Sequence, residues 1–362
     1  MKFKAKTNEL KKVLQQVTSI LIAFPTRPII ANVMFTLRGN ELELISSDYQ
    51  NIMVTSVEVE GEEDGQVVFD GKLLLNILKS TVEPMVSIVK NSDSIQLILT
   101  TGVYDFPIFD PKDYPKLPEM EVADPIEVKS SILTEAIKKT FHTISDDSST
   151  AVGFLLIRIE GMVIKFVSTI GHIVSEFVTS ISSDKYVDLL VSKKSISALK
   201  PLLIGDTIKL IYNKNKVLFQ TETTSFYCVL GTGVFVNYVP LIPPDFNDYL
   251  VVDRSLFLGT LNRLLAMANA QSRHIKLHVQ ADDMEIDCKD NDYKRSASEK
   301  IAIINNGPSL TIGFDAKYLI DILSVYDSDS IKFKLVSDVR PGIIRPDDND
   351  DYTVIIAPLN LP

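Results

Sequence analysis

Apolar and polar residues alternate with the two-residue period of a β-strand in three separate parts of the chain. In each part, two alternating runs flank a short polar turn, a pattern typical of a β-hairpin. Equivalent apolar positions occupy the second run of each hairpin: Leu42 and Leu44, then Ile164 and Phe166, then Met284 and Ile286. The three segments are NVMFTLRGNELELISSD (32–48), VGFLLIRIEGMVIKFVSTIG (152–171) and HIKLHVQADDMEIDCKD (274–290).

A helical pattern precedes each hairpin. In the first, the apolar residues from Leu10 to Val17 recur at spacings of three and four, which predicts an amphipathic helix. Thr7, Ser130 or Ser131, and Asp253 are residue types that favour the N-cap of a helix. The three helical segments are TNELKKVLQQV from Thr7, SSILTEAIKKTF from Ser130 and DRSLFLGTLNRLLAMA from Asp253.

A second phrase, a strand end followed by a lysine and an amphipathic helix, also occurs three times. Its copies are FDGKLLLNILKS (69–80), VSKKSISALKPL (191–202) and FDAKYLIDILSV (314–325), and another hairpin pattern follows each. Lys72, Lys194 and Lys317 recur at steps of 122 and 123 residues. That period has the size of a domain and is too long for a solenoid repeat.

We therefore predict an α+β protein of three similar domains, at residues 1–122, 123–247 and 248–362. Each domain has two helices packed on antiparallel sheets. The joints fall in the proline-bearing segments DYPKLPEMEVADP and VPLIPPDFNDYL, which suit short, stiff connections. A duplication that only enlarged the core would give the same repeat.

The charges are distributed unevenly. The chain of 362 residues has a formal net charge of −10, yet five of the six predicted helices are basic, while acidic residues gather in turns such as EGEEDG and PDDNDDY. One basic helix is usually just a solvated face, but the repeated sign predicts a surface that attracts a polyanion without reading its sequence. The basic residues expected on that face are Lys11, Lys12, Lys72, Lys79, Lys138, Lys139, Lys193, Lys194, Lys200, Arg263 and Lys317.

Other classes of function receive little support from the sequence. Cys228 and Cys288 are the only cysteines and lack the spacing of a zinc site or a disulfide framework, so we expect no metal and no cofactor. No apolar run approaches the ~18 residues of a membrane span, and the start MKFKAKTNEL has no apolar signal core. We expect a cytoplasmic protein without a membrane partner.

Several segments, in order, resemble the bacterial sliding-clamp family, the β subunits of DNA polymerase III. They include MKFKAKTNELKKVLQQVTSI, PTRPIIANVMFTLRGNELELISSD, DYPKLP, VSTIGH, FVNYVPLIP and YTVIIAPLNLP, so the resemblance covers essentially the whole chain. It implies a head-to-tail homodimer that closes into a ring around double-stranded DNA, with the helices lining the channel. It also implies a processivity factor without catalysis, opened by a separate clamp loader because the chain has no GxxxxGK[ST] loop.

The resemblance also implies specific sites. Tyr104 and Phe106 would face Ala266 and Met267 across the dimer interface, although all four could be ordinary core residues. Arg27 would lie in a DNA-facing loop, where Phe24 occupies a position typical of Arg. A pocket between domains two and three would bind short peptides of replicative and repair polymerases. Its residues would be Val152 (or Ala151), Thr169, Gly171, His172, Ile173, Val174, Val236, Pro240, Leu241, Ile355, Ala357, Pro358 and Leu359.

Departures from the family pattern at Ile170, Ile173, Val236, Pro240 and Ala357 predict a more apolar pocket with altered partner preference. A paralogous, plasmid or phage clamp would fit such changes. Two alternatives stay open: a clamp-like scaffold that binds peptides but not DNA, and a hydrolase that uses Ser168 with His172 or the acidic loop Asp347–Asp351.

Overall fold

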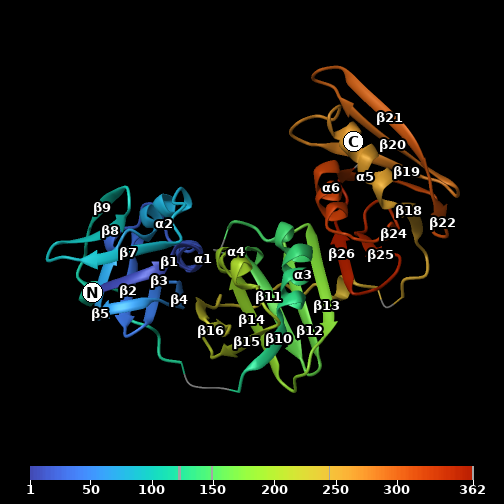
Figure 1. Cartoon of the computed structure of the whole chain (residues 1–362). Coiled ribbons are helices and arrows are strands. Elements are labelled where there is room, and N and C mark those ends of the chain that lie inside the picture. The colour runs from blue at the N-terminus through green and yellow to red at the C-terminus, as the bar shows by residue number, and fades with distance from the viewer. Residues whose placement is uncertain (121–123, 148–149, 244, 361–362) are drawn as a thin grey trace. The chain divides into compact units, whose positions relative to one another are not determined.

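The computed structural model describes residues 1–120, 124–147, 150–243 and 245–360, and within them the chain is an α+β protein built on antiparallel sheets (Figure 1). The α-helices are α1 (Thr7–Thr18), α2 (Gly71–Lys79), α3 (Ser130–Thr140), α4 (Lys193–Leu199), α5 (Arg254–Leu265) and α6 (Ala316–Ser324). Short 3-10 helices are η1 (Pro28–Ala31), η2 (Pro111–Asp113), η3 (Phe141–Thr143), η4 (Ala151–Gly153), η5 (Lys200–Leu202) and η6 (Val239–Leu241). No helix in these ranges is long and apolar enough to cross a membrane.

Contacts divide the chain into two compact units. Unit 1 is Met1–Thr134 with Lys194–Thr232, and unit 2 is Glu135–Lys193 with Gly233–Pro362. The predicted boundary between residues 122 and 123 lies outside the described residues, as does Pro244 in the second predicted joint. The division into three domains therefore stays a prediction.

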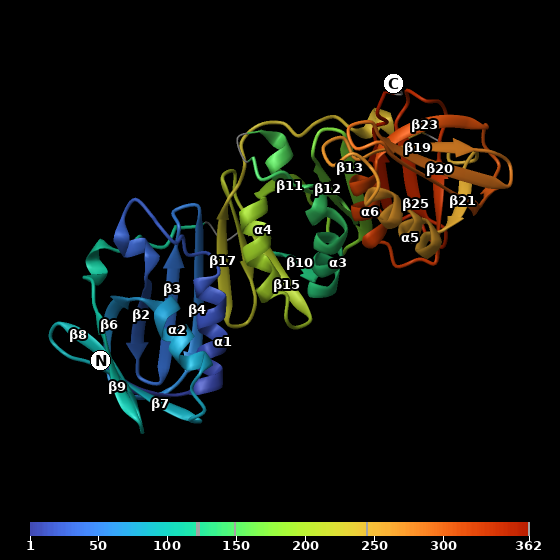
Figure 2. The same ribbon diagram turned by 90° about the horizontal axis from the view of Figure 1, so that it is seen from above.

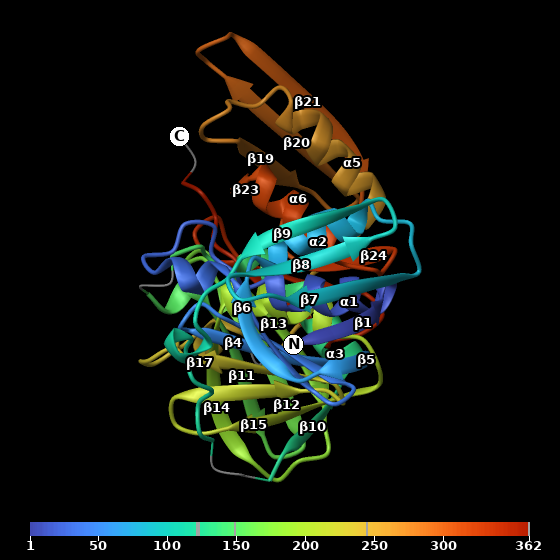
Figure 3. The same ribbon diagram turned by 60° about the vertical axis from the view of Figure 1, so that its left-hand side comes forward.

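Unit 1 contains two sheets, with strand orders β5-β1-β7-β8-β9 and β10-β15-β16-β17-β4-β3-β2-β6. Figure 3 shows β7, β8 and β9 side by side in this unit. Its strands are β1 (Lys2–Lys6), β2 (Val33–Arg38), β3 (Glu41–Ser47), β4 (Asn51–Glu58), β5 (Glu60–Glu63), β6 (Gly65–Phe69), β7 (Met85–Lys90), β8 (Ser94–Leu99), β9 (Gly102–Pro107), β10 (Ile126–Lys129), β15 (Thr207–Tyr212), β16 (Lys216–Gln220) and β17 (Thr224–Val229).

Unit 2 contains two further sheets, ordered β14-β11-β12-β13-β26-β25-β24-β18-β22 and β21-β20-β19-β23. Helices α5 and α6 pack against each other in this unit (Figure 2). Its strands are β11 (Phe154–Glu160), β12 (Val163–Thr169), β13 (Ile173–Ser180), β14 (Tyr186–Ser192), β18 (Leu250–Asp253), β19 (His274–Val279), β20 (Asp283–Asp290), β21 (Arg295–Ala302), β22 (Ile304–Asn305), β23 (Leu310–Asp315), β24 (Ser330–Lys334), β25 (Gly342–Pro346) and β26 (Tyr352–Ile356).

The three predicted hairpins are confirmed as β2-β3, β11-β12 and β19-β20. Their inward-facing positions form the core, because the alternation of each strand gives one apolar face. The six equivalent residues, Leu42, Leu44, Ile164, Phe166, Met284 and Ile286, are all fully buried. The hairpins predicted after the second helices are also present, as β7-β8, β15-β16 and β24-β25.

The predicted helices begin where expected, but one of the predicted N-caps is wrong. The carboxylate of Asp253 accepts a hydrogen bond from the Leu256 amide at 2.7 Å, so it caps α5 as expected. Thr7 does not cap α1: it is already helical, and its hydroxyl donates to the Glu83 carbonyl at 2.5 Å. That tertiary contact occupies the hydroxyl that an N-cap would need.

The same kind of strand pairing joins successive repeats. In the first junction, β17 of the second repeat pairs with β4 of the first, with Phe226 opposite Met53. In the second junction, β26 of the third repeat pairs with β13 of the second, with Val354 opposite Ser175. In the first repeat, β9 is the equivalent of β17. In the third repeat, β21 is the equivalent of β13. Within the described residues, β9 and β21 each form the edge of a sheet.

Candidate functional site

Three segments of unit 2 meet around one apolar cluster on the sheet that contains β13 and β26. Val174 and Ile355 are opposite each other in neighbouring strands, and Phe235 and Tyr238 cover them from the segment that follows β17. The Tyr238 hydroxyl donates to Glu176 on β13, which fixes the covering segment to the strand. The predicted peptide-pocket residues from these three segments are therefore neighbours.

The loop between β12 and β13 has a defined conformation. The Thr169 hydroxyl donates to the Ile173 carbonyl at 2.7 Å and accepts from the Gly171 amide at 3.0 Å. Gly171 has a φ of 98°, which favours glycine because other residues have a Cβ. His172 is exposed at the tip, where its Nε2 lies 3.3 Å from the Tyr318 hydroxyl of α6.

The end of the chain continues the same surface. The Ala357 amide donates to the His172 carbonyl, and the Leu359 amide donates to the Gly313 carbonyl, both at 2.8 Å. A Cβ on Gly313 would lie 2.3 Å from Nε2 of His274 and 3.0 Å from the carbonyl oxygen of Leu359, so glycine permits the close approach of both groups. The backbone of Ala357–Leu359 is thus anchored at both ends.

We call the exposed apolar residues of these segments the apolar surface: Val236, Pro240, Leu241 and Leu359, beside His172. Ile173, Val174 and Ile355 are buried beneath it, while Ala357, Pro358 and Val152 are partly buried. Val152 lies in η4, which contacts β12, and its carbonyl accepts from the Ser145 amide. Exposed apolar side chains on a fixed backbone can bind the large apolar anchors of a peptide.

The proposed hydrolytic groups do not form a catalytic arrangement. Ser168 is fully buried, and its hydroxyl bonds to the Thr140 carbonyl at 2.8 Å and to the Thr143 hydroxyl at 2.6 Å, away from His172. In the acidic loop, Asp347 pairs with Lys332 and Asp351 pairs with Lys139. These groups hold structure together instead of activating a nucleophile.

Many of the basic residues expected to face DNA form ion pairs with carboxylates of the same chain. At least six of the twelve are within ion-pair distance of a carboxylate: Lys138 with Asp327, Lys139 with Glu135 and Asp351, Lys193 with Asp146, Lys194 with Asp48, Arg263 with Glu299, and Lys317 with Asp321. The Lys138 ammonium lowers the pKa of Asp327, and the Arg263 guanidinium lowers that of Glu299. Each bond reduces the charge available to phosphate.

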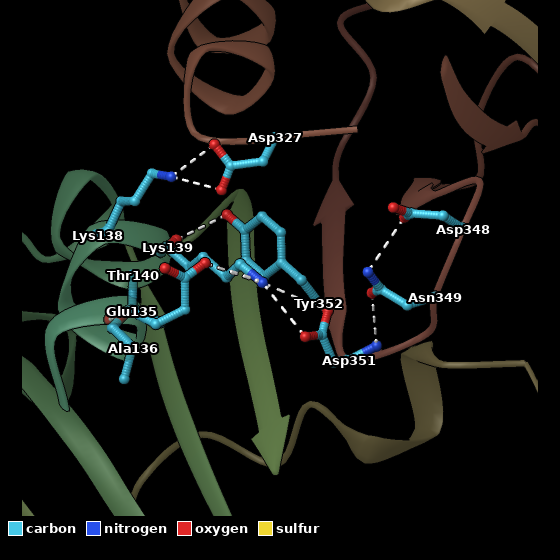
Figure 4. Close-up of polar contacts among 10 residues, drawn as sticks. All are labelled: Glu135, Ala136, Lys138, Lys139, Thr140, Asp327, Asp348, Asn349, Asp351 and Tyr352. Atoms are coloured by element: carbon cyan, nitrogen blue, oxygen red, sulfur yellow. Dashed lines mark hydrogen bonds and ion pairs between the residues drawn. The ribbon is translucent and has the colours of Figure 1, made fainter. Parts of the chain in front are cut away.

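Lys139 requires a correction, because its side chain is buried and cannot face DNA as predicted (Figure 4). The ammonium lies 3.2 Å from Glu135 and 3.3 Å from Asp351, and 4.6 Å from the ring centroid of Phe177. The Lys139 carbonyl accepts a 2.7 Å hydrogen bond from the Tyr352 hydroxyl. This residue joins α3 to the start of β26.

The remaining predicted basic residues lie on helices or loops of unit 1. Lys11 and Lys72 are partly buried, and Lys72 donates to the Leu21 carbonyl at 3.0 Å. Lys12 lines an open polar depression together with Glu127, Asp206 and Glu222. Lys79, Lys200 and Arg27 are exposed, and Phe24 near Arg27 is 96% exposed.

The predicted dimer residues divide into surface and core. Tyr104 on β9 is 41% exposed, and Ala266 and Met267 at the end of α5 are also exposed. Phe106 is 2% exposed and packs edge-on against Phe69 with ring centroids 5.5 Å apart. Phe106 is therefore a core residue that packs β9 against Phe69, and it offers no free surface.

The sequence analysis did not identify Tyr318 and Tyr238, which lie at the apolar surface of unit 2. The repeat held a signal for Tyr238, because Tyr114 precedes it by 124 residues and plays the same part. Tyr114 is buried against Ile45 and Val68 and donates to the Asn32 carbonyl at 2.9 Å. Burial raises the pKa of both phenols.

The chain matches two family models and is similar over its full length to known proteins. Residues 1–118 match the family model of the DNA polymerase III beta subunit, N-terminal domain, and residues 240–360 match that of its C-terminal domain. The beta sliding clamp of Pseudomonas putida is 24% identical over 369 residues, with all of both chains covered. That of Synechococcus elongatus is 23% identical over 377 residues, also with full coverage.

Solved structures share the whole fold. A DnaN sliding clamp from Pseudomonas aeruginosa, bound to griselimycin, has a TM-score of 0.95 and 23% identity to this chain. The DNA polymerase III beta subunit of Thermotoga maritima also has a TM-score of 0.95, at 20% identity. Both comparisons cover 100% of each chain, which confirms the predicted α+β clamp fold.

Proposed function

The chain belongs to the DNA polymerase III beta subunit family, the sliding clamps, and we propose that two copies close into a ring around duplex DNA. The ring would tether polymerases to the DNA without chemistry of its own. A partner held on a ring that cannot leave the strand rebinds instead of diffusing away, which raises its effective concentration. This role requires a cytoplasmic location, where the replication proteins work.

The observation that carries this proposal is the repeated junction. β17 pairs with β4 and β26 pairs with β13, whereas their equivalents β9 and β21 are unpaired edges in the described residues. Phe226 and Val354 are fully buried in their junctions, but Tyr104, at the same position of β9, is 41% exposed. A third junction between β9 and β21 of a partner subunit would bury Tyr104 and remove both edges.

Partner proteins would bind at the apolar surface of unit 2. Short peptides with two or three large apolar side chains suit it, because Val236, Leu241 and Leu359 offer exposed apolar contacts on an anchored backbone. Polymerases, repair proteins and a clamp loader would compete for this surface. Opening and loading of the ring would be done by the loader.

A retention experiment tests the proposal. The chain is loaded by its clamp loader and ATP onto nicked circular DNA, and the bound fraction is measured by gel filtration before and after the circle is linearised. Retention on circles and loss after linearisation are expected, because a ring slides off free ends. Equal retention on both forms, or on neither, would favour the peptide-binding scaffold that does not encircle DNA.

A further inference from the structure

A lysine lies in the first turn of the second helix of each repeat, and its bonding partner differs between the three repeats. Lys72, Lys194 and Lys317 are the second residues of α2, α4 and α6. In the first junction, Lys194 bonds the carboxylate of Asp48, which lies at the end of the preceding repeat's hairpin strand β3. In this junction, the lysine of the second repeat therefore bonds to the hairpin of the first repeat.

The carboxylate of Asp48 is built into its turn. Its Oδ1 accepts from the amides of Gln50 at 3.0 Å and Asn51 at 2.6 Å, which leaves Oδ2 for Lys194 and the side chain of Asn51. The Asp48 side chain is almost fully buried. A buried carboxylate needs such a cation because an unpaired buried charge is strongly destabilising.

The second junction has no carboxylate at the equivalent position. Ile170 follows β12 as Asp48 follows β3, and Lys317 bonds instead to Asp321, one turn further along its own helix, at 2.5 Å. His172 and Tyr318 provide the contact between hairpin and helix there. This junction is a natural control for the ionic one.

The third repeat presents the carboxylate again. Asp290 ends β20 and is 2% exposed, and its Oδ1 accepts from the amides of Asp292 at 3.0 Å and Tyr293 at 3.3 Å. The side chain of Asn269 also donates to Oδ1, at 3.3 Å, but Oδ2 has no hydrogen-bond partner among the described residues. Asp290 thus repeats the turn of Asp48 without its lysine.

We propose that Lys72 of one subunit binds the free carboxylate oxygen of Asp290 of the partner subunit. In the closed ring, the third repeat of one subunit is followed by the first repeat of the partner. Lys72 would then stand to Asp290 of the partner subunit as Lys194 stands to Asp48. Lys72 is partly buried, and among the described residues its ammonium donates to the Leu21 carbonyl, which leaves donors for a carboxylate. This inference rests on the proposed homodimer and adds a specific ionic bond to its interface.

The test measures dimer dissociation of the full chain without DNA, by sedimentation and by subunit-exchange fluorescence. The variants are Lys72→Met, Asp290→Asn and the pair together. The Asp290→Asn change keeps the Oδ1 acceptor that the turn needs, and circular dichroism checks that each variant folds. Each single change is expected to weaken the dimer at least tenfold, and the double variant no more than either single. Lys317→Met, at the same helical position but without a hairpin carboxylate, should leave the dimer constant unchanged.

Three outcomes would overturn the inference. They are a dimer constant for Lys72→Met within twofold of the parent, effects that multiply in the double variant, and an equal loss for Lys317→Met. A parent chain that stays monomeric at micromolar concentration would overturn the ring itself, and the bond with it. A dimeric parent with no coupling between Lys72 and Asp290 would leave the ring standing and remove only the bond.

Discussion

At the scale of single residues, the two adjacent lysines at the end of α3 have opposite environments. Its neighbour Lys138 is exposed and pairs with Asp327, whereas Lys139 is enclosed by Glu135, Asp351 and the ring of Phe177. Adjacent residues on a helix point about 100° apart, so one solvated and one buried lysine are compatible. Glu135 lies one turn away on the same helix, but Asp351 and Phe177 come from residues far away in the sequence.

We predict that Lys139→Met lowers the free energy of unfolding by about 2 kcal/mol, because it leaves two partly buried carboxylates without their cation. Lys138→Met is the matched control and should cost less than about 0.5 kcal/mol, as expected for an exposed pair. Urea unfolding followed by tyrosine fluorescence measures both. Equal small losses would show that the cluster around Lys139 contributes little to stability.

At the scale of elements, the sequence was most informative where a period was regular. Leu42 with Leu44, and Met284 with Ile286, identified core faces correctly because alternation in a strand follows directly from its geometry. The predicted helix does begin at Thr7, but its N-cap role was wrong, since the Thr7 hydroxyl bonds a distant carbonyl that no local pattern reveals. Phe106 was expected at an interface, yet its packing on Phe69 depends on how two strands meet in three dimensions.

The apolar surface could be assembled from the sequence only through the family resemblance. Its three segments lie at Thr169–Val174, Val236–Leu241 and Ile355–Leu359, and no periodicity connects them. The pairing of β13 with β26 brings two of them together, and the cover of Tyr238 adds the third. Long-range pairing of this kind is a property of the tertiary fold.

We predict that a fluorescent peptide with two large apolar residues binds this surface, and that Leu241→Asp weakens binding more than tenfold by placing a charge among apolar contacts. His172→Ala should weaken binding several-fold and leave the fold intact, because the His172 side chain is exposed and its one hydrogen-bond contact among the described residues, to Tyr318, is long. Fluorescence anisotropy measures both affinities.

Tyr186→Asp provides the control, since Tyr186 is a 79% exposed aromatic residue in the same unit but outside the three segments. It should bind the peptide as the parent does. Equal weakening by Tyr186→Asp and Leu241→Asp would mean that the peptide has no specific place on unit 2. Loss of folding in His172→Ala would mean that His172 contributes to the stability of the fold and has no separate role in peptide binding.

At the scale of the whole molecule, the charges suit enclosure better than adhesion. The chain has a net charge of −10, and at least six of the twelve basic residues expected to meet DNA already bond to carboxylates. A side chain that must break an ion pair to reach a phosphate releases little free energy on binding. Direct attraction to the duplex should therefore be weak, and the closed ring would provide the hold.

Weak direct attraction predicts that the affinity for DNA depends only weakly on salt concentration. For the unloaded chain on linear duplex, the logarithm of the affinity should fall with the logarithm of salt concentration at a slope shallower than about −5, as expected for fewer than six neutralised phosphates. The loaded ring on nicked circles should be retained equally at low and at high salt, because enclosure does not depend on counterions. Fluorescence titration and gel filtration measure the two quantities. A slope near −10 would mean that all twelve basic residues reach the DNA, and the ion pairs would then have to open on binding.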